Sequence, residues 1–256
     1  MVPRTRRRAI AYKIAILVGS LRKDSHNRKV ACSICAIRND SLDCSMIEIG
    51  NLPLYNEDLD ANPPEQWVRL RQQVGAADGV LFCGPEYDLG IPGVLKNAFD
   101  VGSRPYGQSV FDKKPAAIVT ASPGSIGGFG SSHQIRQTAV YLNMPLVAQP
   151  EAYLGHVTND SFDESDRLKD GPLKDLVTTL AHAVARDGSR RSSDRARYWR
   201  KMRRKRQTRR RLSRNRHKQI GDAGTAGGPC APNNLKGTTP CSKPKPASRP
   251  TREAGC

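Results

Sequence analysis

The sequence predicts an α/β protein built on a doubly wound parallel sheet. Five short apolar runs alternate with segments whose apolar residues recur at helical spacing. The first run, residues 13–19, is apolar after Lys13 and rich in Ile and Val, which suits a strand buried on both faces. Alternation of strand and helix along a chain is typical of parallel sheets with helices packed on both sides.

The individual elements follow from these runs and from the spacing between them. We expect strands at residues 13–19, 44–49, 79–83, 115–121 and 146–152. Helices are marked by apolar stripes at Val30, Ile34 and Ile37; Trp67, Leu70 and Val74; Val94, Leu95, Ala98 and Phe99; Ile135, Ala139 and Leu142; and Leu173, Leu176, Val177, Leu180 and Val184. Asn27 opens the first of these helices, Pro92 stands at a good first helical position, and residues 51–64, with several prolines and acids, form a loop.

Charge divides the chain into a balanced body and a basic tail. The formal net charge is +18, yet residues 1–185 carry about 20 Lys and Arg against about 20 Asp and Glu. Residues 186–256 carry about 22 against about 4, and they show no apolar periodicity. We therefore predict a basic leader at 1–12, one folded domain at 13–185, and a disordered tail at 186–256 that is Arg-rich and then rich in Gly, Pro and Lys.

Several classes of protein do not fit this composition. No apolar stretch approaches the roughly 18 to 20 residues that span a bilayer, and the arginines near the N-terminus precede no cleavage site. Seven cysteines at irregular spacing predict reduced thiols in a cytoplasmic protein, with Cys32 and Cys35 as core residues of a helix rather than a redox pair. His133, His156 and His182 show no metal-ligand spacing, so no metal is predicted; His26 is either a ligand or a solvent-facing side chain.

The loop after the first predicted strand carries donors suited to a phosphate. Ser20, Ser25 and Asn27 offer hydroxyl and amide groups, Arg22 offers positive charge, and the following helix offers backbone N–H groups. The loop lacks the glycine pattern of dinucleotide folds and the Gly-Lys-Ser/Thr ending of nucleotide triphosphatases. Ser25 or Asn27 could simply cap the helix, but capping does not explain Ser20 together with Arg22.

Two further loops follow predicted strands, where ligands of open parallel sheets bind. One contains Pro85, Glu86, Tyr87 and Asp88, and it could present the N–H groups of Glu86 and Tyr87 and the ring of Tyr87 to a flat ligand. The other contains Ser122, Gly124, Gly127 and Gly128, where a missing Cβ lets the backbone approach such a ligand closely. Each loop alone is a common connection, so the prediction of a site rests on their coincidence.

These motifs resemble those of the NAD(P)H-dependent FMN reductases of flavodoxin-like fold, a group that includes quinone reductases, chromate reductases and azoreductases. Residues 19–27 resemble the family's Gly-Ser-x-Arg-x-x-Ser-x-Asn phosphate loop. Residues 84–87 with 92–98 resemble its second signature, along the isoalloxazine, and 122–124 with 127–128 resemble the third. The resemblance runs from about Lys13 to His156 and implies a five-stranded sheet of order 2-1-3-4-5.

The resemblance also implies cofactors, partners and a mechanism. FMN is the expected cofactor and NADPH or NADH the reductant, with electrons passing to quinones, free flavin, azo compounds or metal oxyanions such as chromate. Because the flavin carries the hydride, no catalytic acid, base or nucleophile is expected. A homodimer or homotetramer is implied, and Arg104 and Tyr106 lie where the family builds its interface near the flavin. The other roles open to them are contact with the nicotinamide phosphate, or those of a solvated Arg and a packing Tyr.

The chain departs from the family pattern at two positions and beyond residue 187. Asp88 stands where the family often has Asn, and Val101 stands where it often has Trp, which affects how the flavin is edged. A rival hypothesis is an inactive flavodoxin-like scaffold whose basic tail binds nucleic acid or another anionic surface. A third is that the tail arises from an altered reading frame after a normal end near Ala185, as its abrupt change in composition suggests.

Overall fold

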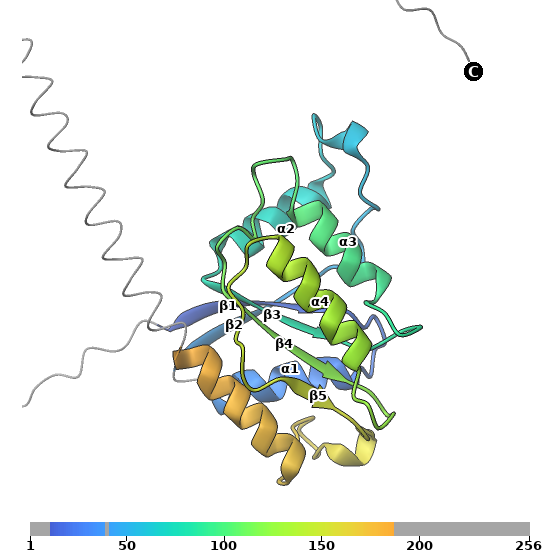
Figure 1. Ribbon diagram of the computed structural model, residues 1–256, viewed down its shortest axis with the longest axis vertical. Helices are drawn as coiled ribbons and strands as arrows, with labels where there is room; N and C mark the ends of the chain where they lie inside the picture. Colours follow the sequence, from blue (N-terminus) through green and yellow to red (C-terminus); the bar gives the residue numbers. More distant parts are fainter. Residues whose placement is uncertain (1–10, 39–40, 187–256) are drawn as a thin grey trace, which may run out of the picture. The chain divides into compact units, whose positions relative to one another are not determined.

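The computed structural model describes residues 11–38 and 41–186 (Figure 1). The predicted leader and tail lie outside these ranges, apart from their innermost residues. Tyr12, assigned to the leader, is already the first residue of a strand.

The described residues form a five-stranded sheet in which every strand pair is parallel. The strands are β1 (Tyr12–Val18), β2 (Leu42–Ile47), β3 (Gly79–Gly84), β4 (Ala116–Ala121) and β5 (Ala152–Leu154), in the order β2-β1-β3-β4-β5. The predicted fold class and strand order are therefore confirmed. Every residue of β3 and β4 is buried, which is why these runs carry no polar alternation.

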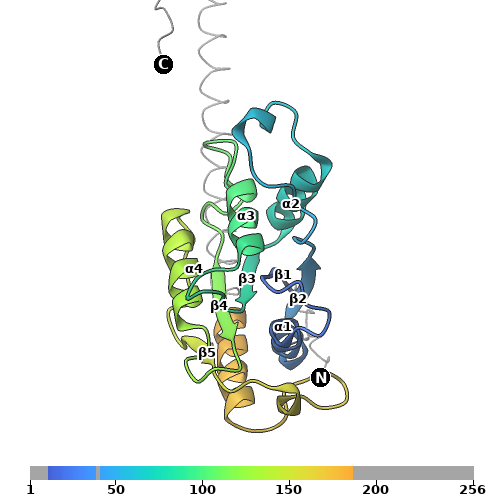
Figure 2. The same cartoon turned by 90° about the vertical axis from the view of Figure 1, so that its right-hand side faces the viewer.

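Helices cover both faces of the sheet (Figures 1 and 2). They are α1 (His26–Ile37), α2 (Glu65–Ala76), α3 (Gly93–Gly102), α4 (Phe129–Tyr141) and an unlabelled helix at residues 172–186; two short 3-10 turns are Glu57–Leu59 and Asn159–Ser161. On one face, apolar residues of α1 and of helix 172–186 share a cluster. On the other face, α2, α3 and α4 share a second cluster, which includes the mutually packed rings of Phe82, Phe99 and Phe111.

Burial of these side chains fixes which face of α1 and of α2 packs against the sheet. Trp67 and Leu70 of α2 and Val30 and Ile34 of α1 are at most 1% exposed. Each such side chain contributes about 1.5–3 kcal/mol when it leaves water. Because every helix runs back across the sheet, the loops that follow the strands gather at one edge, and that edge holds the predicted site.

Two strand predictions needed correction. The last strand was predicted at 146–152, but β5 comprises only Ala152–Leu154, with Leu146 in an isolated bridge to Ala116. Pro150 lies between the two and has no N–H to donate to a ladder, so the segment cannot pair continuously. The second strand is Leu42–Ile47 rather than 44–49, because Leu42 already pairs with Tyr12.

The prediction of reduced thiols was wrong for one pair of cysteines. Cys35, near the end of α1, forms a disulfide with Cys44 of β2, and their Cα atoms lie 6.2 Å apart. This separation falls within the range that disulfides need. The spacing along the chain could not reveal it, because the pairing depends on α1 packing beside the edge strand β2. Cys32 is a free, half-buried thiol and Cys83 a free, buried one.

Among the described residues, no helix is both long enough and apolar enough to cross a membrane.

Candidate functional site

The predicted cofactor residues come together at the carboxyl edge of the sheet. They follow β1, β3 and β4, which are neighbours in the sheet order, at Ser20, Arg22, Ser25 and Asn27; Pro85, Glu86, Tyr87 and Asp88; and Ser122, Gly124, Gly127 and Gly128. Arg104 and Tyr106 do not join them. They follow the C-terminal end of α3 and precede β4, so within one chain they lie toward the opposite edge of the sheet.

The loop after β1 ends at a helix N-terminus that carries a neutral cap. Ser25 is the N-cap of α1, and its hydroxyl accepts a hydrogen bond from the N–H of Arg28 at 3.2 Å. The first turn of α1 contains no acidic residue. Ser20 is 7% exposed and Ser25 2%, so both side chains are buried at this edge. Free N–H groups, hydroxyl donors and the positive end of the helix dipole make this a suitable phosphate site.

The charged side chains around this loop are paired in a way that keeps the loop favourable to an anion. The Arg22 guanidinium lies back over the loop and donates through Nε to the carbonyl of Asp24 at 2.7 Å. The Asp24 carboxylate contacts Lys29 Nζ at 2.5 Å, and this hydrogen bond lowers the pKa of Asp24. Lys29 also contacts Asp166 at 2.8 Å, and the hydrogen bonds to Asp166 and Asp24 raise its pKa. The carboxylate nearest the α1 N-terminus is thus paired.

Asn27 is positioned differently from the other members of the phosphate loop. Its Nδ2 donates to the carbonyl of Ala121 at 3.0 Å, and its Oδ1 accepts from the N–H of Ala121 at 3.1 Å. Cys83 Sγ donates to the Asn27 carbonyl at 2.9 Å, and burial raises the pKa of this thiol. The Asn27 side chain therefore joins the start of α1 to the end of β4, and it lies beneath the phosphate loop, on the side of the sheet.

The loop after β3 is a tight turn that uses one of the two N–H groups expected to face a ligand. Tyr87 N–H donates to Gly90 O at 3.2 Å, and Gly90 N–H donates back at 2.8 Å. Between them, Asp88 and Leu89 have φ of 51° and 57°, as in a type I′ turn. Of the two predicted donors, the Glu86 N–H is the one that this turn does not use. The Tyr87 side chain is 53% exposed, so its ring is accessible at this edge.

The glycines of the loop after β4 serve two different purposes. A Cβ on Gly127 would lie 2.6 Å from the carbonyl carbon of Tyr153, and one on Gly128 would lie 2.9 Å from Cβ of Thr120. Both residues have positive φ. They are needed by the protein's own packing; their predicted close approach to a flat ligand stays a prediction. Gly124 has open space, since the nearest atom to its hypothetical Cβ is Ser122 Oγ at 3.5 Å.

Sequence reasoning missed several groups at this edge. The Oγ1 of Thr120 and the Oγ of Ser131 are buried and have no hydrogen-bond partner in the part of the chain that the structure describes. Gln134 of α4 accepts a hydrogen bond from the N–H of Ile91. None of these positions has a recognisable motif, because each is defined by a contact with a distant segment.

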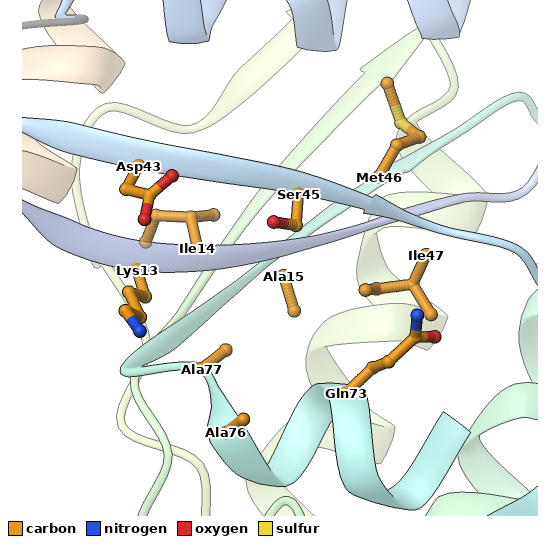
Figure 3. A pocket seen from close by; sticks show the side chains of 10 residues that line it. All are labelled: Lys13, Ile14, Ala15, Asp43, Ser45, Met46, Ile47, Gln73, Ala76 and Ala77. Carbon is orange, nitrogen blue, oxygen red and sulfur yellow. The ribbon is translucent and has the colours of Figure 1, made fainter. Parts of the chain in front are cut away.

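Two hollows lie away from the predicted cofactor residues. Figure 3 shows one of about 280 Å³ between β1, β2 and the end of α2, lined by small and polar residues such as Ser45, Gln73 and Ala77. None of the predicted site residues lines it. Another hollow, of about 510 Å³, is lined by Arg104, Tyr106 and Tyr141. The first exists because β2 is an edge strand whose neighbour α2 ends in small side chains.

The residues present fit FMN. An α1 N-terminus with a neutral cap, two buried hydroxyls and an arginine suit a phosphate monoester. The exposed Tyr87 ring and the open space at Gly124 lie on neighbouring loops of the same edge and suit a flat ring system. Ser20, Ser25, Arg22 and the α1 backbone would hold the phosphate, and the loops after β3 and β4 would hold the ring.

Comparison with known proteins supports the same conclusion. Residues 12–159 match the family model described as NADPH-dependent FMN reductase. A quinone reductase from Pseudomonas putida is 53% identical over 160 residues, which cover 62% of this chain and 86% of the relative. An NAD(P)H-dependent FMN reductase from Pseudomonas aeruginosa is 37% identical over 173 residues, covering 67% and 92%. The solved structure of FerB, a flavoenzyme NAD(P)H:(acceptor) oxidoreductase from Paracoccus denitrificans, is similar with a TM-score of 0.66 and 31% identity, covering 70% of this chain and 98% of that one.

The fold and the site define a flavodoxin-like oxidoreductase that uses FMN and NAD(P)H. The chain belongs to the NADPH-dependent FMN reductase family. The predicted family, enzyme class and cofactors are thereby confirmed.

Proposed function

We propose that this protein is an FMN-containing reductase that takes electrons from NAD(P)H and passes them to quinones. The observation that carries the proposal is the N-terminus of α1, where buried Ser20 and Ser25, exposed Arg22 and a first turn without acids form a phosphate site. This site opens at the same edge as Tyr87 and Gly124. Relatives named quinone reductase and 2-hydroxy-1,4-benzoquinone reductase support the choice of acceptor.

The chain's own residues bind and orient the flavin. FMN, when bound, supplies hydride acceptance and onward electron transfer. We propose no catalytic acid, base or nucleophile. His26, the histidine nearest the phosphate loop, is engaged through Nε2 with Asn159 Oδ1 at 2.8 Å and stacks on Phe162. Exposed apolar side chains near the ring loops, Leu89 at 75% and Ile126 at 66%, favour a flat, weakly polar acceptor such as a quinone.

The other predicted acceptors are free flavin, azo compounds and chromate. Chromate is a small dianion and would compete for positive charge rather than for apolar surface. Steady-state rates with a benzoquinone, FMN, an azo dye and chromate, each at matched NADPH, rank them directly. We expect the quinone to give the highest kcat/KM, and a higher value for chromate would contradict this assignment. NADPH and NADH are compared in the same assay.

Arg104 and Tyr106 suggest that the working unit contains more than one chain. Within one chain they lie away from the cofactor loops, so they would reach a flavin only from a second copy. Tyr106 is 89% exposed and Tyr141, which lines the same hollow, is 84% exposed, so two large aromatic side chains lie open to solvent. We propose a homodimer or homotetramer. Light scattering coupled to gel filtration tests it, and a monomer with full activity would contradict it.

The first experiment is the visible absorbance of protein purified after FMN is supplied, followed by NADPH under anaerobic conditions. Flavin bands that bleach with NADPH and return with a quinone are expected. Protein that remains colourless and shows no affinity for FMN would overturn the proposal. In that case, salt-sensitive nucleic-acid binding that is lost on deleting residues 186–256 would favour the scaffold hypothesis instead.

A cytoplasmic location is also a proposal. Disulfides are rare in the cytosol of mesophiles, so the Cys35–Cys44 bond is the finding that counts against this location. Alkylation of free thiols in rapidly acidified cell extracts, followed by mass spectrometry, reports whether this pair is oxidised in the cell.

A further inference from the structure

The loop after β3 and the start of α4 are joined by two reciprocal hydrogen bonds. Glu86 Oε2, in the loop, accepts from the N–H of Ser131 in the first turn of α4 at 2.9 Å. Gln134 Oε1, one turn further along α4, accepts from the N–H of Ile91 in the loop at 3.0 Å. A loop side chain thus caps the helix, and a helix side chain supports the loop.

The two segments are in direct contact between these bonds. A Cβ on Gly130 of α4 would lie 2.6 Å from the carbonyl oxygen of Leu89 and 2.8 Å from Glu86 Oε2. Only glycine allows the loop to lie this close to the helix. Gly90 is similarly close to the Gln134 side chain, with its hypothetical Cβ 3.3 Å from Oε1.

The turn held in this way has a backbone that needs support. Leu89 has a φ of 57°, which is uncommon for a residue that is neither Gly nor Asn, and its side chain is 75% exposed. Burial of the Leu89 side chain therefore does not offset the strain. Glu86 and Gln134 bind the chain on either side of the turn, at the two points where it could relax.

We propose that Glu86 and Gln134 are positioning residues for the flavin ring: together they fix the loop that carries Tyr87 onto α4. The inference rests on the proposed function, because it assigns the ring to this loop. It adds a role for the Glu86 side chain to the expectation that Glu86 presents a backbone N–H. What position 86 must supply is a hydrogen-bond acceptor, which a glutamine side chain also provides.

Two substitutions at Glu86 and a matched pair on α4 test the proposal. Glu86→Ala and Gln134→Ala should each weaken FMN affinity about tenfold, the effect of losing one cap-type hydrogen bond, and shift the visible spectrum of bound FMN. Glu86→Gln should keep FMN affinity within about threefold of wild type, because the acceptor remains. Gln137→Ala, an exposed Gln three residues further along α4, is the control and should leave affinity and spectrum unchanged.

Hydrogen exchange of the FMN-free protein gives a readout that does not depend on the cofactor. Peptides that contain Ser131 and Ile91 should exchange faster in Glu86→Ala and Gln134→Ala than in wild type, and not in Gln137→Ala. Unchanged FMN affinity in Glu86→Ala, or a Glu86→Gln variant as weak as Glu86→Ala, would overturn the inference while leaving the proposed function intact. A wild-type protein that binds no FMN would overturn the proposed function, and the inference with it.

Discussion

The helices α1 and α4 both begin at the carboxyl edge of the sheet, yet their N-termini are used differently. The α1 N-terminus is capped by the neutral hydroxyl of Ser25, and no acidic residue lies in its first turn. The α4 N-terminus starts from Gly128, which has no side chain to cap it, and receives the carboxylate of Glu86 from another loop. A carboxylate satisfies the positive end of a helix as a phosphate does. The α1 N-terminus thus carries no negative charge, as a phosphate site would require, whereas the α4 N-terminus is already bound by a side chain of the protein itself.

The largest expected effect separates a glycine that the fold requires, Gly127, from one that we propose to face the ligand, Gly124. Gly127→Ala should lower the free energy of unfolding by about 3 kcal/mol, because its Cβ would meet the Tyr153 backbone at 2.6 Å and its φ is +67°. Gly124→Ala should change stability by less than about 0.5 kcal/mol and instead weaken FMN binding. Urea unfolding of the FMN-free proteins measures the first effect and fluorescence titration the second. Equal stability of the two variants would contradict the distinction.

The second prediction places a carboxylate at the N-terminus of α1, as Glu86 does at the N-terminus of α4. Ser25→Asp keeps an oxygen that can cap the helix but adds negative charge where the phosphate is expected. We expect its Kd for FMN to rise about 100-fold through charge repulsion at short range. Ser25→Asn, nearly the same shape without the charge, is the control, and both variants should fold because both residues cap helices well. Fluorescence titration in low salt gives both values; similar affinities for Asp and Asn would place the phosphate elsewhere.

The sequence predicted which segments would meet at this edge and why. Apolar runs and helical stripes sufficed for the elements, and parallel strands bring the loops after β1, β3 and β4 together wherever the exact boundaries fall. The roles within the loops were harder to predict. Asn27 is bonded to Ala121, 94 residues away, and Glu86 to Ser131, 45 residues away. The type of a side chain and its local spacing do not reveal whether that side chain will form its hydrogen bonds with a distant backbone group.

The disulfide was missed for the same reason, and it provides the third prediction, at the opposite end of α1. Closing a loop over the separation of 9 residues between Cys35 and Cys44 should contribute about 2.5 kcal/mol to stability. Cys44→Ala, or reduction of the wild type, should lower the free energy of unfolding by that amount. FMN affinity should stay unchanged, since the bond lies far along α1 from its N-terminus. A loss of affinity on reduction would show that the two ends of α1 are coupled.

The smallest expected effect concerns Cys83, which lies beneath the α1 N-terminus and donates its S–H to the Asn27 carbonyl. Burial raises its pKa above the ordinary value of 9.0, so only the unfolded chain ionises this thiol as the pH rises past 9. Its contribution to stability is therefore complete below pH 9 and decreases above it. Relative to pH 8, the loss at pH 10 should be about 1.4 kcal/mol. Other groups, including Tyr55 and Tyr153, also have raised pKa values, so the test is the difference between wild type and Cys83→Ala. In urea unfolding, that difference in the free energy of unfolding should shrink between pH 8 and pH 10. A constant difference would mean that the thiol also ionises in the folded protein, and therefore that solvent reaches Cys83 beneath the α1 N-terminus.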